Sequence, residues 1–258
     1  MIVNITHNNL KYICNLSSPI DISIPIKKEG VIAWNIPDIN ITPVKKGGWI
    51  GDIKKGGAVN FNNIFFNPHA HSTHTECIGH ISPIKESINN ELSTFFFVSK
   101  LVTIAPKVRN GDCIITKDML SRLIKKGENI DALIIRTLPN EKIKLSKNYS
   151  NTNPPYLLKE GAKYLANINI KHLLIDLPSV DKERDGGLVN AHKSFWGFPE
   201  NKRHGCTITE LIYVSGEVKD GKYLLNLQFI PFENDASPSR PLLFKMVEFS
   251  FVLFPETK

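Results

Sequence analysis

The segment from His69 to His80 concentrates residues that can bind a metal ion and move protons. It reads HAHSTHTECIGH and supplies His69, His71, His74, Glu76 and His80 within twelve positions. Imidazole nitrogens and carboxylate oxygens hold zinc or manganese while leaving a coordination position for a water, which the metal acidifies into a nucleophile. A single histidine is usually a packed or surface residue, but a cluster with an interposed glutamate favours a metal centre.

The spacing of these residues divides them between two faces. In an extended segment, residues of equal parity share a face. His74, Glu76 and His80 would then lie together, and His69 and His71 would lie on the opposite side. We therefore expect the first group to form the metal-binding and proton-transfer face.

Two residues farther along the chain could complete this site. Glu210 is the only charged residue on one face of a predicted strand, where it alternates with Cys206, Ile208 and Ile212. A carboxylate on an apolar face is costly unless it is paired or binds a metal, although the face could instead be exposed to solvent. His192 lies on a predicted short helix and is either a further ligand or a packed, hydrogen-bonded histidine.

The chain resembles the cyclase-type metal-dependent hydrolases, a family that includes bacterial kynurenine formamidase and isatin hydrolase. Its signature has the form HxGTHxDxPxH, and its threonine, second histidine, acid and last histidine match Thr73, His74, Glu76 and His80. Further matching stretches follow in the family's order over most of the chain: LSSPIDISIPI, ALIIRT, DLPSVD, AHKSFWG and TITELI. The resemblance implies a swivelling β/β/α fold, hydrolase activity and assembly as a homodimer or homotetramer.

The resemblance also implies a role for each matched residue. His74 and Glu76 would bind metal, and His80 would be the catalytic general acid or base. His192 and Glu210 resemble the distal histidine and glutamate that complete a two-metal site. The expected cofactor is a divalent metal, with Zn²⁺ preferred and Mn²⁺ as the alternative, bound as one or two ions.

Four positions depart from the family signature, among them Glu76 in place of its aspartate and Ile78 in place of its proline. Its first histidine falls on Ala70, which cannot coordinate a metal, and its glycine falls on Ser72. A neighbouring histidine must replace the lost ligand, and we expect His71 rather than His69, because His71 is nearer to His74. This replacement requires a turn or bulge near Ser72, because His71 otherwise points away from the metal face.

Alternating strands and helices must position these residues. Strands are expected over 20–26, 58–66, 132–135, 172–175, 206–214, 223–232 and 242–254, and helices over 119–124, 156–166 and around His192. The histidine segment then follows a strand, the loop DLPSVD follows another, and the polar loop ENDASPSRP is placed to cover a pocket. We predict a mixed α/β or α+β protein, with residues 1–258 in a single domain around a central mixed β-sheet or barrel.

Composition and charge narrow the remaining classes of protein. Of the 258 residues, 41% are hydrophobic and 22% are charged, which is typical of globular proteins. The net charge of +7 would permit nucleic-acid binding, but the lysines occur as scattered pairs beside glycine or glutamate, as in solvated turns. No apolar run of about 20 residues is present, the N-terminus does not resemble a signal peptide, and the four cysteines form no CxxC pair. We expect a cytoplasmic protein without membrane or nucleic-acid partners.

The leading hypothesis is a metal-dependent amidohydrolase, similar to arylformamidases, whose substrate is a small amide, formamide or cyclic amide. Metal-bound hydroxide would attack the carbonyl carbon, and His80 would carry a proton to the leaving nitrogen of the C–N bond. The alternative is a metal- or small-molecule-binding protein of the same fold that has lost catalysis with the change at Ala70. Stoichiometric metal without hydrolysis of any substrate would favour this alternative.

Overall fold

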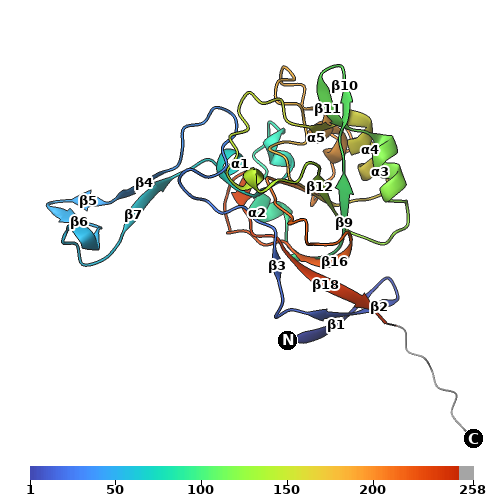
Figure 1. The fold of residues 1–258 in the computed structure, drawn as a ribbon, viewed down its shortest axis with the longest axis horizontal. Helices are drawn as coiled ribbons and strands as arrows, with labels where there is room; N and C mark the ends of the chain where they lie inside the picture. Colours follow the sequence, from blue (N-terminus) through green and yellow to red (C-terminus); the bar gives the residue numbers. More distant parts are fainter. Residues whose placement is uncertain (250–258) are drawn as a thin grey trace, which may run out of the picture.

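The largest sheet of the structure joins eleven strands. The computed structural model describes residues 1–249. The strands of this sheet are β1 (Ile2–His7), β2 (Leu10–Asn15), β3 (Ile20–Asp21), β8 (His74–Glu76), β9 (Phe96–Ile104), β12 (Ala132–Thr137), β14 (His172–Ile175), β15 (Thr207–Glu210), β16 (Gly221–Asn226), β17 (Ala236–Pro238) and β18 (Leu242–Glu248). Their order is β1-β2-β18-β16-β9-β12-β14-β15-β8-β17, with β3 paired to β18. Figure 1 labels several of them, among them β9, β12 and β16.

The centre of this sheet is parallel and buried on both faces. Strands β9, β12, β14 and β15 run parallel to one another, and β8 is antiparallel to β15. Every residue of β12 is buried: Leu133 and Ile135 belong to one core cluster, and Ala132 and Ile134 belong to another. A strand that is covered on both faces reads as a continuous apolar run rather than an alternating one.

Three helices contribute to the first of these core clusters, and Figure 1 shows them grouped on one side of the molecule. They are α3 (Lys117–Leu123), α4 (Lys159–Asn167) and α5 (Asn190–Trp196). Each buries apolar side chains against the sheet, for example Leu120, Leu165 and Phe195. The short helices are α1 (Pro68–His71), α2 (Ile88–Glu91), η1 (Ile53–Lys55), η2 (Ile78–His80) and η3 (Lys142–Leu145).

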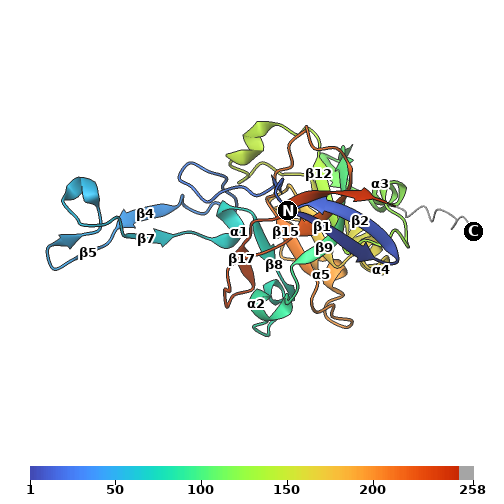
Figure 2. The same ribbon diagram turned by 90° about the horizontal axis from the view of Figure 1, so that it is seen from below.

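Residues 40–65 form a β-hairpin, here called the arm, that extends away from the rest of the molecule (Figures 1 and 2). Its base pairs β4 (Asn40–Pro43) with β7 (Asn62–Phe65), and its far end pairs β5 (Lys45–Lys46) with β6 (Trp49–Ile50). A separate three-stranded sheet contains β10 (Lys107–Arg109), β11 (Asp112–Ile115) and β13 (Tyr156–Leu157).

The predicted mixed α/β class is confirmed, with a central mixed sheet rather than a barrel. Over residues 1–249 the strand order is an open path, so the barrel alternative is wrong for this part of the chain. The strand predicted over 58–66 is shorter and belongs to the arm. Residues 250–254 of the last predicted strand lie outside the described residues.

The helix predicted over 156–166 begins later than expected. Tyr156 and Leu157 pair in parallel with Ile114 and Ile115 of β11, and α4 starts only at Lys159. No helix within residues 1–249 is long and apolar enough to cross a membrane.

Candidate metal centre

Strand β8 carries His74 and Glu76 into the interior between β15 and β17. The two side chains are fully buried and lie on the same face, because side chains two positions apart in a strand share a face. Thr73 fixes the start of the strand, since its hydroxyl accepts the backbone N–H of Ile24 at 2.7 Å and donates to the carbonyl oxygen of Leu211. The strand therefore presents an imidazole and a carboxylate from a rigid backbone.

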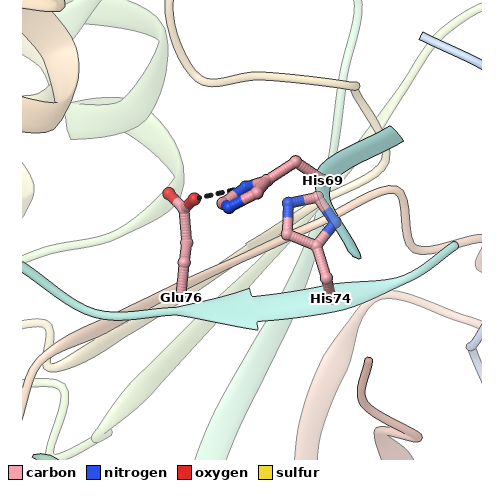
Figure 3. A group of neighbouring side chains, drawn as sticks. All are labelled: His69, His74 and Glu76. Carbon is pink, nitrogen blue, oxygen red and sulfur yellow. Dashed lines mark ion pairs between the residues drawn. The ribbon is translucent and has the colours of Figure 1, made fainter. Parts of the chain in front are cut away.

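Helix α1 brings His69 to these two residues. Asn67 caps the helix by accepting the backbone N–H of His69 at 2.9 Å, and Pro68 occupies the first turn. Nδ1 of His69 lies 3.3 Å from Oε2 of Glu76, and its ring meets that of His74 edge-on at 4.9 Å between centroids. Figure 3 shows His69 reaching in from α1 above the two side chains of β8.

The structure places His71 outside this group, so the expectation that His71 rather than His69 approaches His74 is corrected. Nδ1 of His71 accepts the backbone N–H of Asn67 at 2.9 Å, and Nε2 donates to the carbonyl oxygen of Pro37 at 3.1 Å. Both ring nitrogens are therefore engaged with the backbone. The physical reason is that residues 68–71 form a helical turn, in which side chains two positions apart point in nearly opposite directions.

His192 approaches the same group from helix α5. The Asp181 carboxylate accepts the backbone N–H groups of Ala191 and His192 at 2.7 and 3.1 Å, and it lies 2.6 Å from Nδ1 of His192. Nε2 of His192 is 2.9 Å from Oε1 of Glu76. The side chain is thus held between two carboxylates, on the short helix that the sequence predicts.

Glu210 is buried beside His74 rather than exposed to solvent. It is 3% exposed, and β15 places it directly opposite His74 in the sheet. Its Oε1 accepts the backbone N–H of Val180 at 2.7 Å, and its Oε2 lies 3.5 Å from Nε2 of His74. Glu210 therefore borders the cluster from the neighbouring strand.

His80 and Asp235 close the cluster on its solvent side. Nε2 of His80 lies 3.8 Å from Oε2 of Glu76, and Nδ1 lies 3.0 Å from Oδ2 of Asp235. The same Asp235 oxygen is 3.0 Å from Nε2 of His69. Asp235 is not predicted from the sequence. Its only signal there is its place in the loop ENDASPSRP, of which Ala236–Pro238 form β17 and pair with β8.

Within the cluster, His69, His192 and the Glu76 carboxylate are held in their charged forms by their neighbours. Burial lowers the pKa of His192, but the negative charge of Glu76 and the hydrogen bond to Asp181 outweigh it and raise this pKa well above its usual value. Burial raises the pKa of the Glu76 carboxyl, but the charges of His80 and His192 hold it well below its usual range. Burial likewise lowers the pKa of His69, yet the hydrogen bond to Asp235 and the negative charge of the nearby Glu76 carboxylate raise it to about 10. A bound cation would replace these protons, because metal ligands must be deprotonated.

The donor set fits a divalent metal ion. Nε2 of His74 and Oε2 of Glu76 are buried and make no hydrogen bond, which is costly for a polar atom without another partner. Nδ1 of His74 donates to the carbonyl oxygen of Ser72 at 3.0 Å, so Nε2 presents its lone pair. Ligand atoms lie within 4.8 Å of one another in three overlapping groups: His69, His74 and Glu76; Glu76, His80 and His192; and His69, His80 and Asp235. Imidazole nitrogens with carboxylate oxygens suit zinc or manganese.

A cavity of about 370 Å³ adjoins the cluster. Its lining includes the histidines His69, His80 and His192 and the apolar side chains of Trp34 and Ile36. This volume falls in the range of small-molecule sites, which combine apolar walls with a few polar groups.

Known proteins of similar sequence and structure place the chain in a family. The family model described as "Putative cyclase" matches residues 20–182, which is more than half of the chain. No curated protein gives a significant match to the sequence.

Three solved structures illustrate the likeness of fold. The structure of a potential metal-dependent hydrolase with cyclase activity aligns with a TM-score of 0.63 at 21% identity, covering 88% of this chain and 98% of that chain. That of a predicted metal-dependent hydrolase from Bacillus stearothermophilus gives 0.61 at 21% identity, with the same coverage. Isatin hydrolase A from Labrenzia aggregata, bound to benzyl benzoate, gives 0.60 at 14% identity, covering 88% of this chain and 93% of that chain. The fold is shared with these structures, and the family match shows that this protein belongs to the Cyclase family.

Proposed function

We propose that this protein is a metal-dependent hydrolase that cleaves the C–N bond of a small amide, formamide or cyclic amide. The observation that carries the proposal is the buried pair of atoms without hydrogen-bond partners, Nε2 of His74 and Oε2 of Glu76. They lie in a cluster of donors beside a cavity of small-molecule size. The solved structures named above, a potential and a predicted metal-dependent hydrolase and an isatin hydrolase, support hydrolysis as the class of reaction.

The proposed ligands are His69, His74 and Glu76, with His192 and Glu210 placed to hold a second ion. His69 takes the ligand role that was expected of His71. Zn²⁺, or Mn²⁺ as the alternative, would polarise a carbonyl oxygen and lower the pKa of a water beside it. Glu76 has one carboxylate oxygen toward His69 and the other toward His192, so it lies between the two proposed groups of ligands.

His80 is the proposed proton carrier. Its side chain is 32% exposed and lines the cavity, whereas His74 and His192 are buried deeper. Asp235 holds Nδ1, which leaves Nε2 as the atom that takes a proton from the attacking water and gives it to the leaving nitrogen. An imidazole suits this role because its ordinary pKa is near 6.5.

The walls of the cavity favour an amide that is attached to, or part of, a ring. Trp34 and Ile36 offer apolar surface, and the Trp34 indole N–H donates to the carbonyl oxygen of His69 at 3.3 Å. This bond fixes the aromatic wall relative to a proposed ligand. A flat cyclic or aryl substrate would then stack on Trp34 with its carbonyl toward the cluster.

Metal analysis and a substrate panel test this function together. The metal content of the purified protein is measured first, and the panel contains an aryl formamide, a cyclic amide and an aryl ester. We expect one or two divalent ions per chain and hydrolysis of at least one C–N substrate. The His80→Ala variant should lose turnover and keep its metal, whereas His204→Ala, which changes an exposed histidine paired with Glu91, should keep both.

Two results would contradict the proposal. Stoichiometric metal without hydrolysis of any substrate would favour the binding protein that the change at Ala70 suggests. Full activity of the His80→Ala variant would show that another group moves the proton.

The arm supports a proposal that the protein assembles as a homodimer or homotetramer. It exposes large apolar side chains, namely Trp49, Ile53, Val59, Phe61, Ile64 and Phe65. The body of the molecule exposes apolar side chains of its own at Ile84, Ile230 and Phe232. A second copy would offer both surfaces, and contiguous exposed apolar patches mark interaction sites.

We also propose a cytoplasmic location, which agrees with four free cysteine thiols.

A further inference from the structure

Asp235 completes a ring of contacts among four side chains, one of which is the proposed ligand His69. The others are Glu76 and His80. Nδ1 of His69 lies 3.3 Å from Oε2 of Glu76, and Nε2 lies 3.0 Å from Oδ2 of Asp235. His80 spans the same two carboxylates, with Nε2 at 3.8 Å from Glu76 and Nδ1 at 3.0 Å from Asp235. The two imidazole rings stack at 4.5 Å between centroids. Each histidine therefore has one nitrogen toward Glu76 and the other toward Asp235.

This arrangement determines which nitrogen of each ring can carry a single proton. An ionised carboxylate only accepts hydrogen bonds, so Oδ2 of Asp235 calls for an N–H on both nitrogens that face it. These are Nε2 of His69 and Nδ1 of His80. The lone pairs are then left on Nδ1 of His69 and on Nε2 of His80, which face Glu76.

The backbone holds Asp235 in place for this task. Its carbonyl oxygen accepts the N–H of Cys77 at 3.0 Å, and that of the preceding Asn234 accepts the N–H of Ile88 at 2.8 Å. Directly after it, β17 pairs with β8, with Ala236 opposite Glu76. Asp235 is therefore tied to the strand that carries Glu76, although the two residues are far apart in the sequence.

We propose that Asp235 is a positioning residue shared by two histidines. It selects the tautomer of His69 that has its lone pair on Nδ1 and can bind a cation. It also selects the tautomer of His80 that has its lone pair on Nε2 and can accept a proton. The proposal rests on the proposed function, and it explains how a histidine one position before Ala70 can serve as a ligand. Outer-shell carboxylates that hold a ligating histidine act on metal affinity in this way.

The test compares Asp235→Asn with Glu233→Gln. An asparagine keeps the size of the side chain, but its neutral amide oxygen is a weaker acceptor than a carboxylate, and its NH₂ group, where it takes the place of Oδ2, favours the wrong form of both histidines. Glu233 is an exposed acid two positions away that bonds to the side chain of Asn89, so its variant removes an equal charge without touching either histidine. Zinc affinity is measured by competition with a chelating dye, and circular dichroism checks that each variant folds.

We expect Asp235→Asn to weaken zinc binding about 10- to 100-fold, as for other outer-shell partners, and Glu233→Gln to leave it within twofold of the wild type. At saturating zinc, Asp235→Asn should also lower kcat with little change in KM, because His80 no longer presents its lone pair. In ¹⁵N–¹H spectra of the zinc-loaded protein, the signal of the His69 Nε2 proton should weaken or vanish. Asp235→Glu, which restores a carboxylate, should recover part of both losses.

The outcomes separate this proposal from the proposed function. Wild-type zinc affinity and unchanged histidine spectra in Asp235→Asn would overturn the role of Asp235, while hydrolysis by the wild type would keep the function. Equal losses in Asp235→Asn and Glu233→Gln would also overturn it, because they would indicate a general effect of charge. A wild type that binds zinc tightly but hydrolyses nothing would overturn the function alone, and one that binds neither Zn²⁺ nor Mn²⁺ would overturn both.

Discussion

The metal centre and the arm both depart from the usual distribution of side chains, in which polar groups face water and apolar groups lie inside. The centre buries groups that normally face water, with His74, Glu76, His192 and Glu210 all at most 3% exposed. The arm exposes groups that normally lie inside, and Phe65 at its base is 68% exposed. Buried charges and contiguous exposed apolar surface both require compensation.

The two regions obtain this compensation from different sources. In the centre, most buried charges meet opposite charges of the same chain, such as the Asp181 carboxylate at 2.6 Å from His192. In the arm, one internal contact is the pair of the Trp49 and Phe61 rings, at 6.2 Å between centroids. An isolated two-stranded hairpin is only marginally stable in water. The proposed metal ion would complete the compensation in the centre, and the proposed second copy of the chain would cover the arm.

The largest effect is expected from replacing each of the two histidines of α1 by alanine in turn. His69→Ala should weaken zinc binding by more than the roughly 100-fold that outer-shell partners contribute, because it removes a proposed ligand. His71→Ala should keep the metal and lower the free energy of unfolding by about 1–3 kcal/mol, since the backbone groups of Asn67 and Pro37 lose a buried partner. Zinc titration and urea unfolding measure the two quantities. The reverse pattern would return the ligand role to His71.

The next effect concerns the arm. The double variant Ile64→Asp and Phe65→Asp places two charges on exposed apolar positions, so it should dissociate an oligomer formed through the arm. Burying each side chain contributes about 1.5–3 kcal/mol, which corresponds to a weakening of about 100-fold or more for the pair. Sedimentation over a range of concentrations measures the dissociation.

Val108→Asp is the matched control for the arm. Val108 lies on β10 and is 77% exposed, so this change adds a charge to another exposed apolar site without affecting the arm. A wild type that sediments as a monomer at all concentrations, or equal effects of both changes, would remove the arm from the assembly.

The sequence predicts the metal centre in part because strands follow a simple geometric rule. His74 and Glu76 share a face as expected, since β8 is a regular strand. His69 could have been assigned, because Asn67 followed by Pro68 is a common start of a helix, and a helical turn separates His69 from His71. Asp235 could not, because only the pairing of β17 with β8 brings it to the cluster.

The arm shows a different limit of prediction from sequence. The stretch over 58–66 has the apolar composition of a buried strand, but its residues 62–65 form β7 and are all exposed. A pattern of apolar residues indicates that a surface will be covered. It does not say whether the residues that cover this surface belong to the same chain or to another. In the centre, by contrast, the residue types themselves indicate that histidines and carboxylates belong together.

Metal removal should lower the stability of the protein by the same amount whether or not the arm is changed. At a zinc concentration 100 times its Kd, binding to the folded state adds about 2.7 kcal/mol to the free energy of unfolding. Thermal unfolding should therefore shift to lower temperature with a chelator in the wild type and in the variant with Asp at positions 64 and 65. The His74→Ala variant should show little response. A loss of the zinc response on changing the arm would show that the two regions are coupled.

The smallest effect comes from a buried histidine that lacks the carboxylates of the centre. His172 on β14 is 1% exposed and packs against Phe97 at 4.0 Å between ring centroids. Burial, together with the positive charges of Lys171 and Arg203, lowers the pKa of His172 to about 3, whereas the pKa of the equally buried His192 is raised by Glu76 and Asp181. The two histidines are equally buried, so the carboxylates beside His192 account for the opposite direction of its pKa shift.

The consequence is a loss of stability in acid that His172 causes by itself. Its pKa is about 3 in the folded chain and about 6.5 in the unfolded chain, so between these values the unfolded chain binds more protons. The stabilising contribution of neutral His172 is complete above pH 6.5 and is lost as the pH falls toward 3, by roughly 2 kcal/mol between pH 7 and pH 5. His172→Asn, whose amide can keep the hydrogen bond to Thr207, should flatten this dependence in urea unfolding at pH 7, 6 and 5. An unchanged slope in the variant would mean that the carboxylates and histidines of the centre, rather than His172, determine the response to acid.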